Sequence, residues 1–206
     1  MEKNKLQHHN ITTDTLFDDI QNIIEQGRQQ AYAAANQITV LTYWHIGRRI
    51  VEEEQHGEAR AQYGTRLIKT LAEQLMPKYG NTFSKRNLDY FRQFYLCFSD
   101  LEIVNACVHN LTWTHFRTII QVADPKAREW YAKEASEQMW SSRTLRRNIG
   151  TQYYGRRMAC IREGLALPSP DIEANDPLEY IKSPVVAEFL GFRKDSKYNE
   201  SQLEQA

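Results

Sequence analysis

Six arginines and no acidic residue lie between residues 141 and 162, which gives this segment a local charge of +6. Guanidinium groups bind phosphate oxygens through charge-assisted hydrogen bonds, so such a segment is typical of a surface that contacts a nucleic-acid backbone. Helical periodicity predicts one long helix from Ser141 or Ser142 to about Ala159, with most of the arginines within about a quarter-turn of one another. The predicted DNA-binding residues of this segment are Arg143, Arg146, Arg147, Arg156 and Arg157.

A second group of basic and polar residues follows a predicted turn. Pro77 is expected to end a helix that begins near Ala59, and Ser84 is a good N-cap for a helix through Phe98. Two helices joined by a tight polar turn form the outline of a helix-turn-helix unit, whose second helix can reach a DNA groove. The residues expected on the inward face of that helix are Leu88, Phe91, Phe94, Tyr95 and Phe98. Its predicted DNA-binding residues are Lys85, Arg86, Asn87 and Arg92.

Both basic groups have an alternative explanation, because an exposed helix face is often charged simply for solubility. This alternative is weaker for residues 141–162. Solvent-exposed helices usually contain ion pairs between residues four positions apart, and this segment has no acid with which to form them. Residues 163–206 hold nine acidic and four basic residues, a local charge of −5, so the zero net charge of the chain hides two opposite segments. This acidic tail could pair with the arginines internally, and its removal would then raise DNA affinity.

Known catalytic motifs are absent from the sequence. It has no phosphate-binding glycine loop, no HExxH, no GxSxG and no Glu-x-Lys triplet, whose glutamate helps to hold Mg²⁺ in restriction-like nucleases. His109 and His115 flank Trp113 but should lie on different helix faces, so a structural role is favoured over a metal site. We therefore expect a non-catalytic chain without cofactors, and an autonomous enzyme is the least favoured alternative.

Composition indicates a mainly all-α protein. Glycine (9) and proline (6) are sparse, and a hydrophobic fraction of 41% is enough to build a core. We expect a multi-helical bundle that contains the helix-turn-helix-like unit, with a short winged-helix-type strand pair as a further option. The three cysteines form no CxxC pair and are expected to be reduced thiols. Because no membrane-spanning run or signal-peptide core occurs, a cytoplasmic location without membrane contact is expected.

The first helix is expected to begin at Asp14 and to reach about Glu54, either as one helix or as two joined near Gly27. Its apolar stripe could be core or a dimer interface, and the stripe consists of Ile20, Ile23, Ala31, Ala34, Ile38 and Leu41. Residues 99–110 are expected to form an irregular link.

Two further helices are expected before the arginine-rich segment. Thr112 should cap a short helix through Val122, and the Asp124-Pro125 pair should start a helix to about Gln138. The four tryptophans lie within apolar patterns and are expected in the core.

Several short motifs, taken in order, resemble the N-terminal domain of the YhcG-like PDDEXK nucleases, in which a helical region precedes a restriction-endonuclease-like domain. The resemblance covers roughly residues 15–160. The motifs are YWHIGRRI (43–50), YG (63–64), FSKRNL (83–88), RQFY (92–95), LTWTH (111–115), REWY (128–131) and WSSRTLRRNI (140–149), with a weaker similarity at Asp176-Pro177 and EFLGF (188–192).

The resemblance implies DNA as the substrate class of the parent nuclease, a role in defence or mobile-element contexts, and Mg²⁺ only in a nuclease domain that this chain lacks. Together with the polar start, the helical pattern and the proline-containing segment near residue 170, it leads us to expect a disordered tail (1–13), a helical DNA-binding domain (14–162), and a linker with the start of the nuclease domain (163–206). Two functions stay open: a DNA-binding module, or a dimerisation or partner-binding module, in which case a homodimer is expected.

Overall fold

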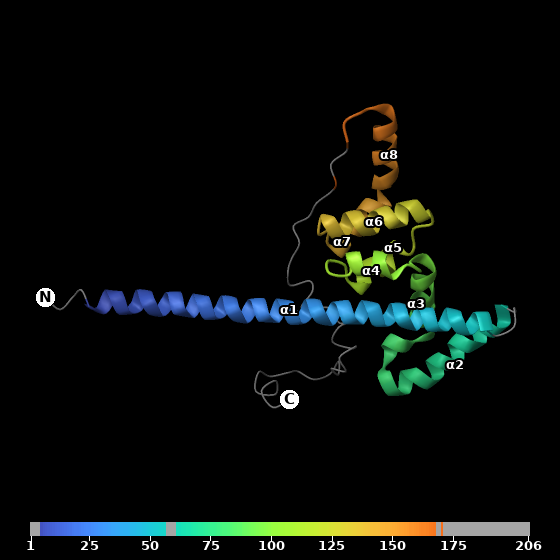
Figure 1. The fold of residues 1–206 in the computed structure, drawn as a ribbon, viewed down its shortest axis with the longest axis horizontal. Coiled ribbons are helices and arrows are strands. Elements are labelled where there is room, and N and C mark those ends of the chain that lie inside the picture. The colour runs from blue at the N-terminus through green and yellow to red at the C-terminus, as the bar shows by residue number, and fades with distance from the viewer. Residues whose placement is uncertain (1–4, 57–60, 168–169, 171–206) are drawn as a thin grey trace.

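The computed structural model describes residues 5–56, 61–167 and 170, and every regular element in that part of the chain is a helix (Figure 1). This confirms the all-α prediction, and the optional strand pair of a winged helix does not occur among the described residues. The elements are α1 (Lys5–His56), α2 (Ala61–Tyr79), the 3₁₀ helix η1 (Asn81–Phe83), α3 (Lys85–Cys97), α4 (Leu101–Cys107), α5 (Trp113–Ile119), α6 (Pro125–Glu137), α7 (Ser142–Gly150) and α8 (Tyr153–Glu163).

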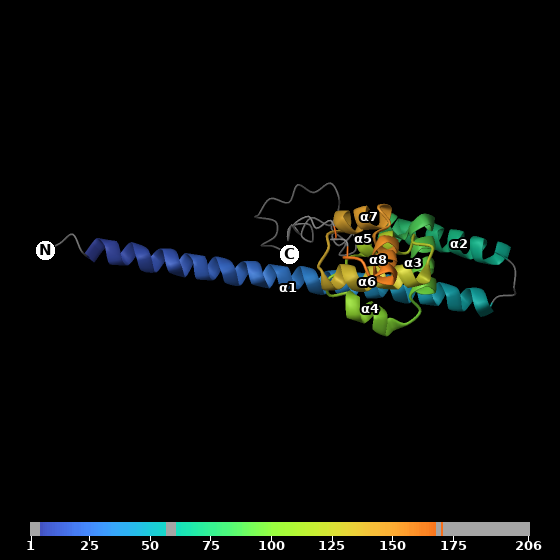
Figure 2. The same ribbon diagram turned by 90° about the horizontal axis from the view of Figure 1, so that it is seen from above.

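Helix α1 is a single rod of 52 residues, about 78 Å long at 1.5 Å per residue. It begins at Lys5, so the predicted start near Asp14 is wrong, and residues 5–13 of the expected disordered tail are helical. It also passes Gly27 without a break, which excludes the alternative of two helices. Figures 1 and 2 show that its N-terminal half projects away from the other helices, whereas its C-terminal half packs against them.

The main core lies where the C-terminal half of α1 crosses α3. The ring of Tyr43 stacks on Phe91 with centroids 4.1 Å apart, and Trp113 packs edge-on against both rings at 5.1 and 5.2 Å. The indole nitrogen of Trp44 donates a 2.6 Å hydrogen bond to the carbonyl oxygen of Phe98, which ties the end of α3 to α1. The aromatic face predicted for α3 is therefore confirmed, because Leu88, Phe91, Phe94 and Phe98 are all buried.

The turn between α2 and α3 differs from the prediction at its first residue. Pro77 does not stop α2, which continues to Tyr79, where a proline in the last turn forfeits few helical hydrogen bonds. Gly80 then takes a φ of 88°, which favours glycine, and its amide donates to the carbonyl of Met76 at 3.0 Å. Ser84 occupies the predicted N-cap of α3, although its side chain makes no capping hydrogen bond.

Residues 99–110 were expected to be irregular, and this is wrong because α4 lies within them. Asp100 caps this helix by accepting a 2.8 Å hydrogen bond from the amide of Glu102, and Val104 and Cys107 are buried. The caps predicted for the next two helices are confirmed. Asp124 accepts from the amide of Lys126 at 2.9 Å, and Thr112 forms the N-cap of α5.

We predict that Gly47→Ala destabilises the protein by about 3 kcal/mol, because a β-carbon at Gly47 would lie 1.9 Å from the carbonyl oxygen of Phe91. Backbone atoms of α3 cannot move aside as a flexible side chain can. Chemical denaturation followed by circular dichroism measures the effect.

The matched control is Gly155→Ala, because a β-carbon there would meet nothing within 4 Å. This change should raise the free energy of unfolding by about 0.5–1 kcal/mol through helix propensity alone. Equal stabilities of the two variants would contradict the close approach of α1 and α3.

Candidate nucleic-acid interface

Helix α7 has a buried face and a basic face. Ser141 caps it, as predicted, and accepts a 3.0 Å hydrogen bond from the amide of Thr144. Its inward side consists of Thr144, Leu145 and Asn148, which are at most 1% exposed. Its outward side carries three exposed arginines, Arg143, Arg146 and Arg147. The structure thus brings three of the predicted residues together on one surface.

The predicted single long helix is wrong, because the segment folds as α7 and α8. The break falls at Thr151 and Gln152, and Gln152 adopts a left-handed backbone with φ of 52°. The amides of these two residues donate back to the last carbonyls of α7, at 2.9 Å to Arg147 and 3.0 Å to Ile149. The arginines are therefore divided between two helices and do not form one ridge.

Two of the predicted α8 residues make contacts within the protein. Arg157 lies 3.9 Å from the carboxylate of Glu134 on α6 and above the ring of Trp130, and its side chain is only 27% exposed. Arg156 is exposed, lies above Tyr153 and donates a 3.2 Å hydrogen bond to the hydroxyl of Thr151. Arg157 thus joins α8 to α6, so one of the predicted DNA-binding residues is paired with an acid of another helix.

An aromatic cluster supports this end of the molecule. The rings of Trp130, Trp140 and Tyr153 pack against one another with centroids 5.8–6.4 Å apart. The hydroxyl of Tyr131 donates to the carbonyl of Asn148 at 3.1 Å and accepts from the amide of Tyr154 at 3.0 Å. One side chain of α6 therefore fixes both the end of α7 and the start of α8. Burial of this phenol raises the pKa of Tyr131, which keeps its hydroxyl neutral.

Two of the predicted α3 residues are held by other parts of the chain. The amide of Asn87 donates to the carbonyl of Thr82 at 3.0 Å, which stabilises the turn before α3. Arg92 donates to Glu54 at 2.6 Å and so joins α3 to the end of α1. This predicted DNA-binding residue is therefore engaged by an acid of α1, and its side chain is 38% exposed.

The other two α3 residues remain on the surface. Lys85 is exposed and pairs with Asp89 at 3.2 Å, so its charge is opposed within the same helix. Arg86 is exposed and lies over the ring of Tyr90, at 5.6 Å from its centroid. Arg117 of α5 lies over the same ring at 5.9 Å. Sequence reasoning missed Arg117, since only the packing of α3 beside α5 brings it to Arg86.

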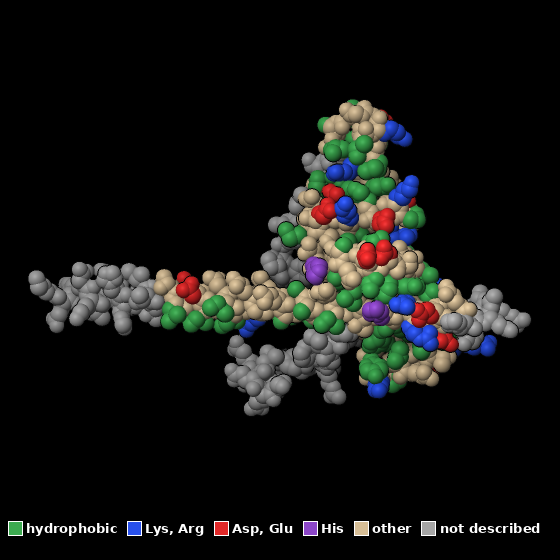
Figure 3. Space-filling model, viewed as in Figure 1, with side chains coloured by type: hydrophobic (Ala, Val, Ile, Leu, Met, Phe, Trp, Pro, Cys, Tyr) green, Lys and Arg blue, Asp and Glu red, His purple; other side chains and the backbone are tan. Residues whose placement is uncertain are grey.

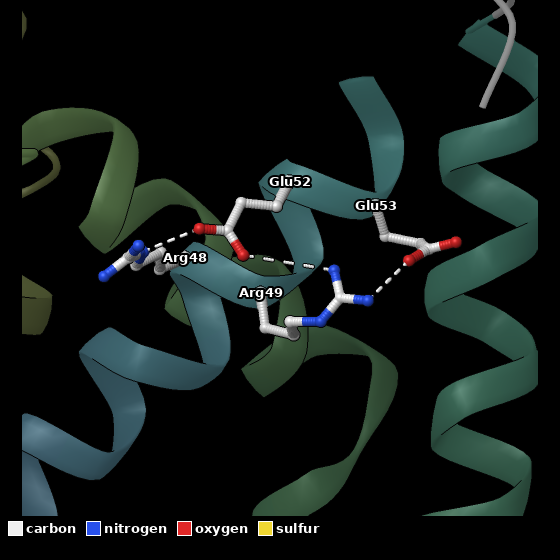
Figure 4. A network of polar contacts seen from close by, with 4 residues as sticks. All are labelled: Arg48, Arg49, Glu52 and Glu53. Atoms are coloured by element: carbon white, nitrogen blue, oxygen red, sulfur yellow. Dashed lines mark hydrogen bonds and ion pairs between the residues drawn. The ribbon is translucent and has the colours of Figure 1, made fainter. Parts of the chain in front are cut away.

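Two arginines on α1 form ion pairs with acids on the same helix, as is common for basic residues on a helix surface. Arg48 donates to Glu52 at 2.7 Å, and Arg49 donates to Glu53 at 2.8 Å, each four residues along the helix (Figure 4). The hydrogen bond from Arg48 to Glu52 raises the pKa of Arg48. No such pairing is available within residues 141–162, because they contain no acid.

The two basic groups lie at different levels of the molecule. Helix α5 contacts both α3 and α7, and α8 extends farthest from α1 (Figure 1). On the face drawn in Figure 3, basic and acidic side chains are interspersed, and no large basic patch covers that face. The α7 arginines and the α3 basic residues therefore form two separate groups and not one continuous basic surface.

No cluster of three or more histidine, cysteine or acidic side chains that could hold a metal ion occurs among the described residues. The structural role predicted for His115 is confirmed. Its Nδ1 interacts with the amide of Thr112 at 3.1 Å, and its Nε2 lies 2.9 Å from the carbonyl oxygen of Trp140. The three cysteines are free thiols, as expected, and burial raises the pKa of Cys107 and of Cys97.

Comparisons with known proteins agree with this helical architecture. The model of the DUF1016 N-terminal domain matches residues 19–156. The chain belongs to this family. It is 33% identical, over an alignment 223 positions long, to the Escherichia coli (strain K12) protein named "Putative nuclease YhcG", and the alignment covers 93% of this chain and 59% of that protein. No solved structure matches the chain.

The family match confirms the resemblance to the N-terminal domain of YhcG-like nucleases. The chain spans 59% of the length of YhcG. The matched segment of the DUF1016 N-terminal domain ends at residue 156, within α8, and so includes all of α7 and its three arginines. Within the described residues, no helix is long and apolar enough to cross a membrane.

We predict that Arg92 acts structurally in this DUF1016 N-terminal domain. Arg92→Gln should lower the free energy of unfolding by about 1 kcal/mol, because Glu54 is only 15% exposed and would lose its partner. Denaturant titration tests this.

Lys85→Gln provides the comparison, since both members of the Lys85–Asp89 pair are about half exposed. Its effect should stay within about 0.5 kcal/mol. A larger loss for Lys85→Gln than for Arg92→Gln would contradict the roles assigned to these two ion pairs.

Proposed function

We propose that this chain is a DNA-binding module that directs a cytoplasmic nuclease to its substrate. The observation that supports the proposal best is the outward face of α7, where Arg143, Arg146 and Arg147 are exposed in a segment without acids. Three guanidinium groups on about one turn of helix suit successive phosphates of a nucleic-acid backbone. The membership in a family that includes a protein named as a nuclease is consistent with DNA as the partner.

The proposed contact is electrostatic, between arginines and phosphates, and does not involve hydrogen bonds to the DNA bases. Helix α7 is held by its buried face and by the hydrogen bond from Tyr131 to Asn148, so its arginines begin from ordered backbone positions and lose little backbone entropy on binding. Arg156 and Arg162 are also exposed, on the adjacent α8, but the break between α7 and α8 separates them from the α7 arginines. Contacts with phosphates position a protein on DNA but carry no sequence information. We therefore propose binding with little sequence preference.

The α3 residues take a smaller part in this proposal. Lys85 and Arg86 are exposed and can reach a phosphate, whereas Asn87 and Arg92 are held by Thr82 and Glu54. The aromatic face of α3 is buried in the core, and the exposed basic residues of this helix lie in its first turn. A helix-turn-helix mode with α3 lying deep in a groove is thus the less favoured geometry.

DNA cleavage, and the Mg²⁺ that it would require, is assigned in this proposal to the portion of YhcG-like proteins that lies outside the 59% covered by this chain. The role proposed for this chain is to hold DNA while that portion cuts. A role in defence against mobile DNA would follow from such an activity.

The main test is the triple variant Arg143→Glu, Arg146→Glu and Arg147→Glu. We expect duplex DNA affinity to fall on the order of 100-fold, because three attractive contacts become repulsive. The wild-type chain should also lose affinity steeply with salt, and removal of three phosphate contacts should reduce the salt slope by about 3. Fluorescence anisotropy at several salt concentrations measures both quantities.

The charge-matched control is the triple variant Arg66→Glu, Lys69→Glu and Lys78→Glu, which reverses three exposed cations on α2. It changes the net charge by the same amount and should keep most of the wild-type affinity. If both variants bind equally well, or if the wild-type chain binds independently of salt, the proposed interface is wrong.

A second test concerns cleavage. The chain alone should bind but not cut plasmid DNA with Mg²⁺ or Mn²⁺, because the sequence has no Glu-x-Lys triplet. Gel analysis of supercoiled, branched and single-stranded substrates is the measurement. Metal-dependent nicking that survives removal of contaminating nucleases would assign catalysis to this chain.

A further inference from the structure

The free half of α1 exposes large hydrophobic side chains that no other described part of the chain covers. Phe17 is 65% exposed and Ile23 is 68% exposed. The exposed large hydrophobic residues of this half are Leu16, Phe17, Ile20, Ile23 and Ile24, and Figure 3 shows hydrophobic side chains along one edge of the projecting rod. A contiguous apolar face of this kind on a soluble domain marks an interaction site.

The spacing of this face is that of a coiled coil. Phe17, Ile24, Ala31 and Ile38 follow one another at intervals of seven residues, and Ile20, Gly27, Ala34 and Leu41 repeat the interval three positions later. These are the a and d positions of more than three heptads. A heptad repeat returns to the same face every ~3.5 residues, which favours a long helical partner over a compact surface.

We propose that this seam pairs with the same seam of a second copy of the chain, in antiparallel orientation. If Phe17 of one copy lies opposite Ala34 of the other, then Ile20 lies opposite Ala31, and Ile24 lies opposite Gly27. In each layer a large side chain then lies opposite a small one. The two-fold axis generates a second, equivalent copy of each of these layers. The open space around Gly27, with nothing within 4 Å of a β-carbon there, is where the partner's Ile24 fits.

The parallel alternative matches sizes poorly. In register, it places Phe17 on Phe17 at one end and Gly27 on Gly27 near the middle, so the two helices would need a wide spacing at one layer and a close one at another. Straight helices cannot meet both demands without leaving cavities. The antiparallel register keeps the spacing nearly constant along the seam.

The length of the seam suits a weak, concentration-dependent dimer. In this register the paired layers run from Phe17 to Ala34, about 26 Å of helix, and a strip ~100° wide along it corresponds to roughly 650 Å² for the two copies together, which is in the range of transient interfaces. The rest of the fold leaves room for this partner. Among residues 15–56 of α1, whose burial is described, the first buried residue is Asn36, so the layers from Phe17 to Ala34 lie on the exposed part of the rod.

The test is light scattering of the 206-residue chain at several concentrations. The wild-type chain should reach twice the 24.2 kDa of one copy, and Ile24→Glu should weaken the dimer on the order of 100-fold by placing a charge in the seam. Because Ile24 is exposed and far from the core, the variant should keep the wild-type circular dichroism spectrum, and its unfolding temperature should fall only by the amount that dimerisation contributes. Gln29→Glu, which adds the same charge at an exposed position outside the a and d repeats, should remain dimeric.

Orientation is tested by disulfide trapping. Ile20→Cys mixed with Ala31→Cys should give a cross-linked heterodimer in the antiparallel register, whereas Ile20→Cys alone should not cross-link. The wild-type chain under the same oxidation gives the background from Cys97 and Cys160, which are half-buried.

Each result decides between these arrangements. A monomeric wild-type chain, a larger oligomer, or an Ile24→Glu variant that still dimerises would overturn the proposal. Efficient cross-linking of Ile20→Cys to itself would overturn the antiparallel register. DNA affinity does not enter any of these measurements, so the dimer and the DNA-binding function can fail independently.

Discussion

The contact between α1 and α3 at Gly47 is the constraint on which the other helices depend. Because glycine has no side chain, the backbone of α3 at Phe91 comes against α1 directly, and the aromatic rings on either side interlock. Trp113 of α5 packs on this pair, and His115, two residues later, joins the carbonyl of Trp140 immediately before α7. A chain of contacts through α3 and α5 therefore connects the position of α7 to Gly47 on α1.

The sequence of α7 differs from that of most other helices because it contains arginines and no acidic residue. On α1, α2, α3 and α6, basic side chains lie one turn from an acid on the same helix, as in the pairs Arg48–Glu52, Lys69–Glu73 and Lys133–Glu137. Such pairs neutralise a surface locally and are weak in water. The segment 141–162 contains no acid, so its charge cannot be cancelled in this way. The lack of acids in this segment is the reason that we propose DNA binding at α7. The domain is also related to a protein named as a nuclease.

Sequence patterns predicted the features that are set by neighbouring residues. The caps at Asp124 and Ser141 and the core face of α3 follow from residues within one or two helical turns. Patterns failed where tertiary contacts or single backbone angles decide. Arg92 and Arg157 look solvent-facing on a helical projection, but each meets a glutamate from a distant element. The break at Gln152 depends on one left-handed residue, which propensity does not reveal because glutamine favours helix.

The same limit applies to the first helix. Its apolar stripe is visible in the sequence, but a stripe can be core or interface, and only the structure shows that Asn36 and Val40 are buried while Ile20 and Ile24 are exposed. An unbroken helix is also stiff. From Phe17 to Asn36, about 28 Å of rod separates the exposed apolar face from the packed helices. A partner bound to that face would therefore be held at a fixed distance and orientation relative to the packed helices, because the helix between them is stiff.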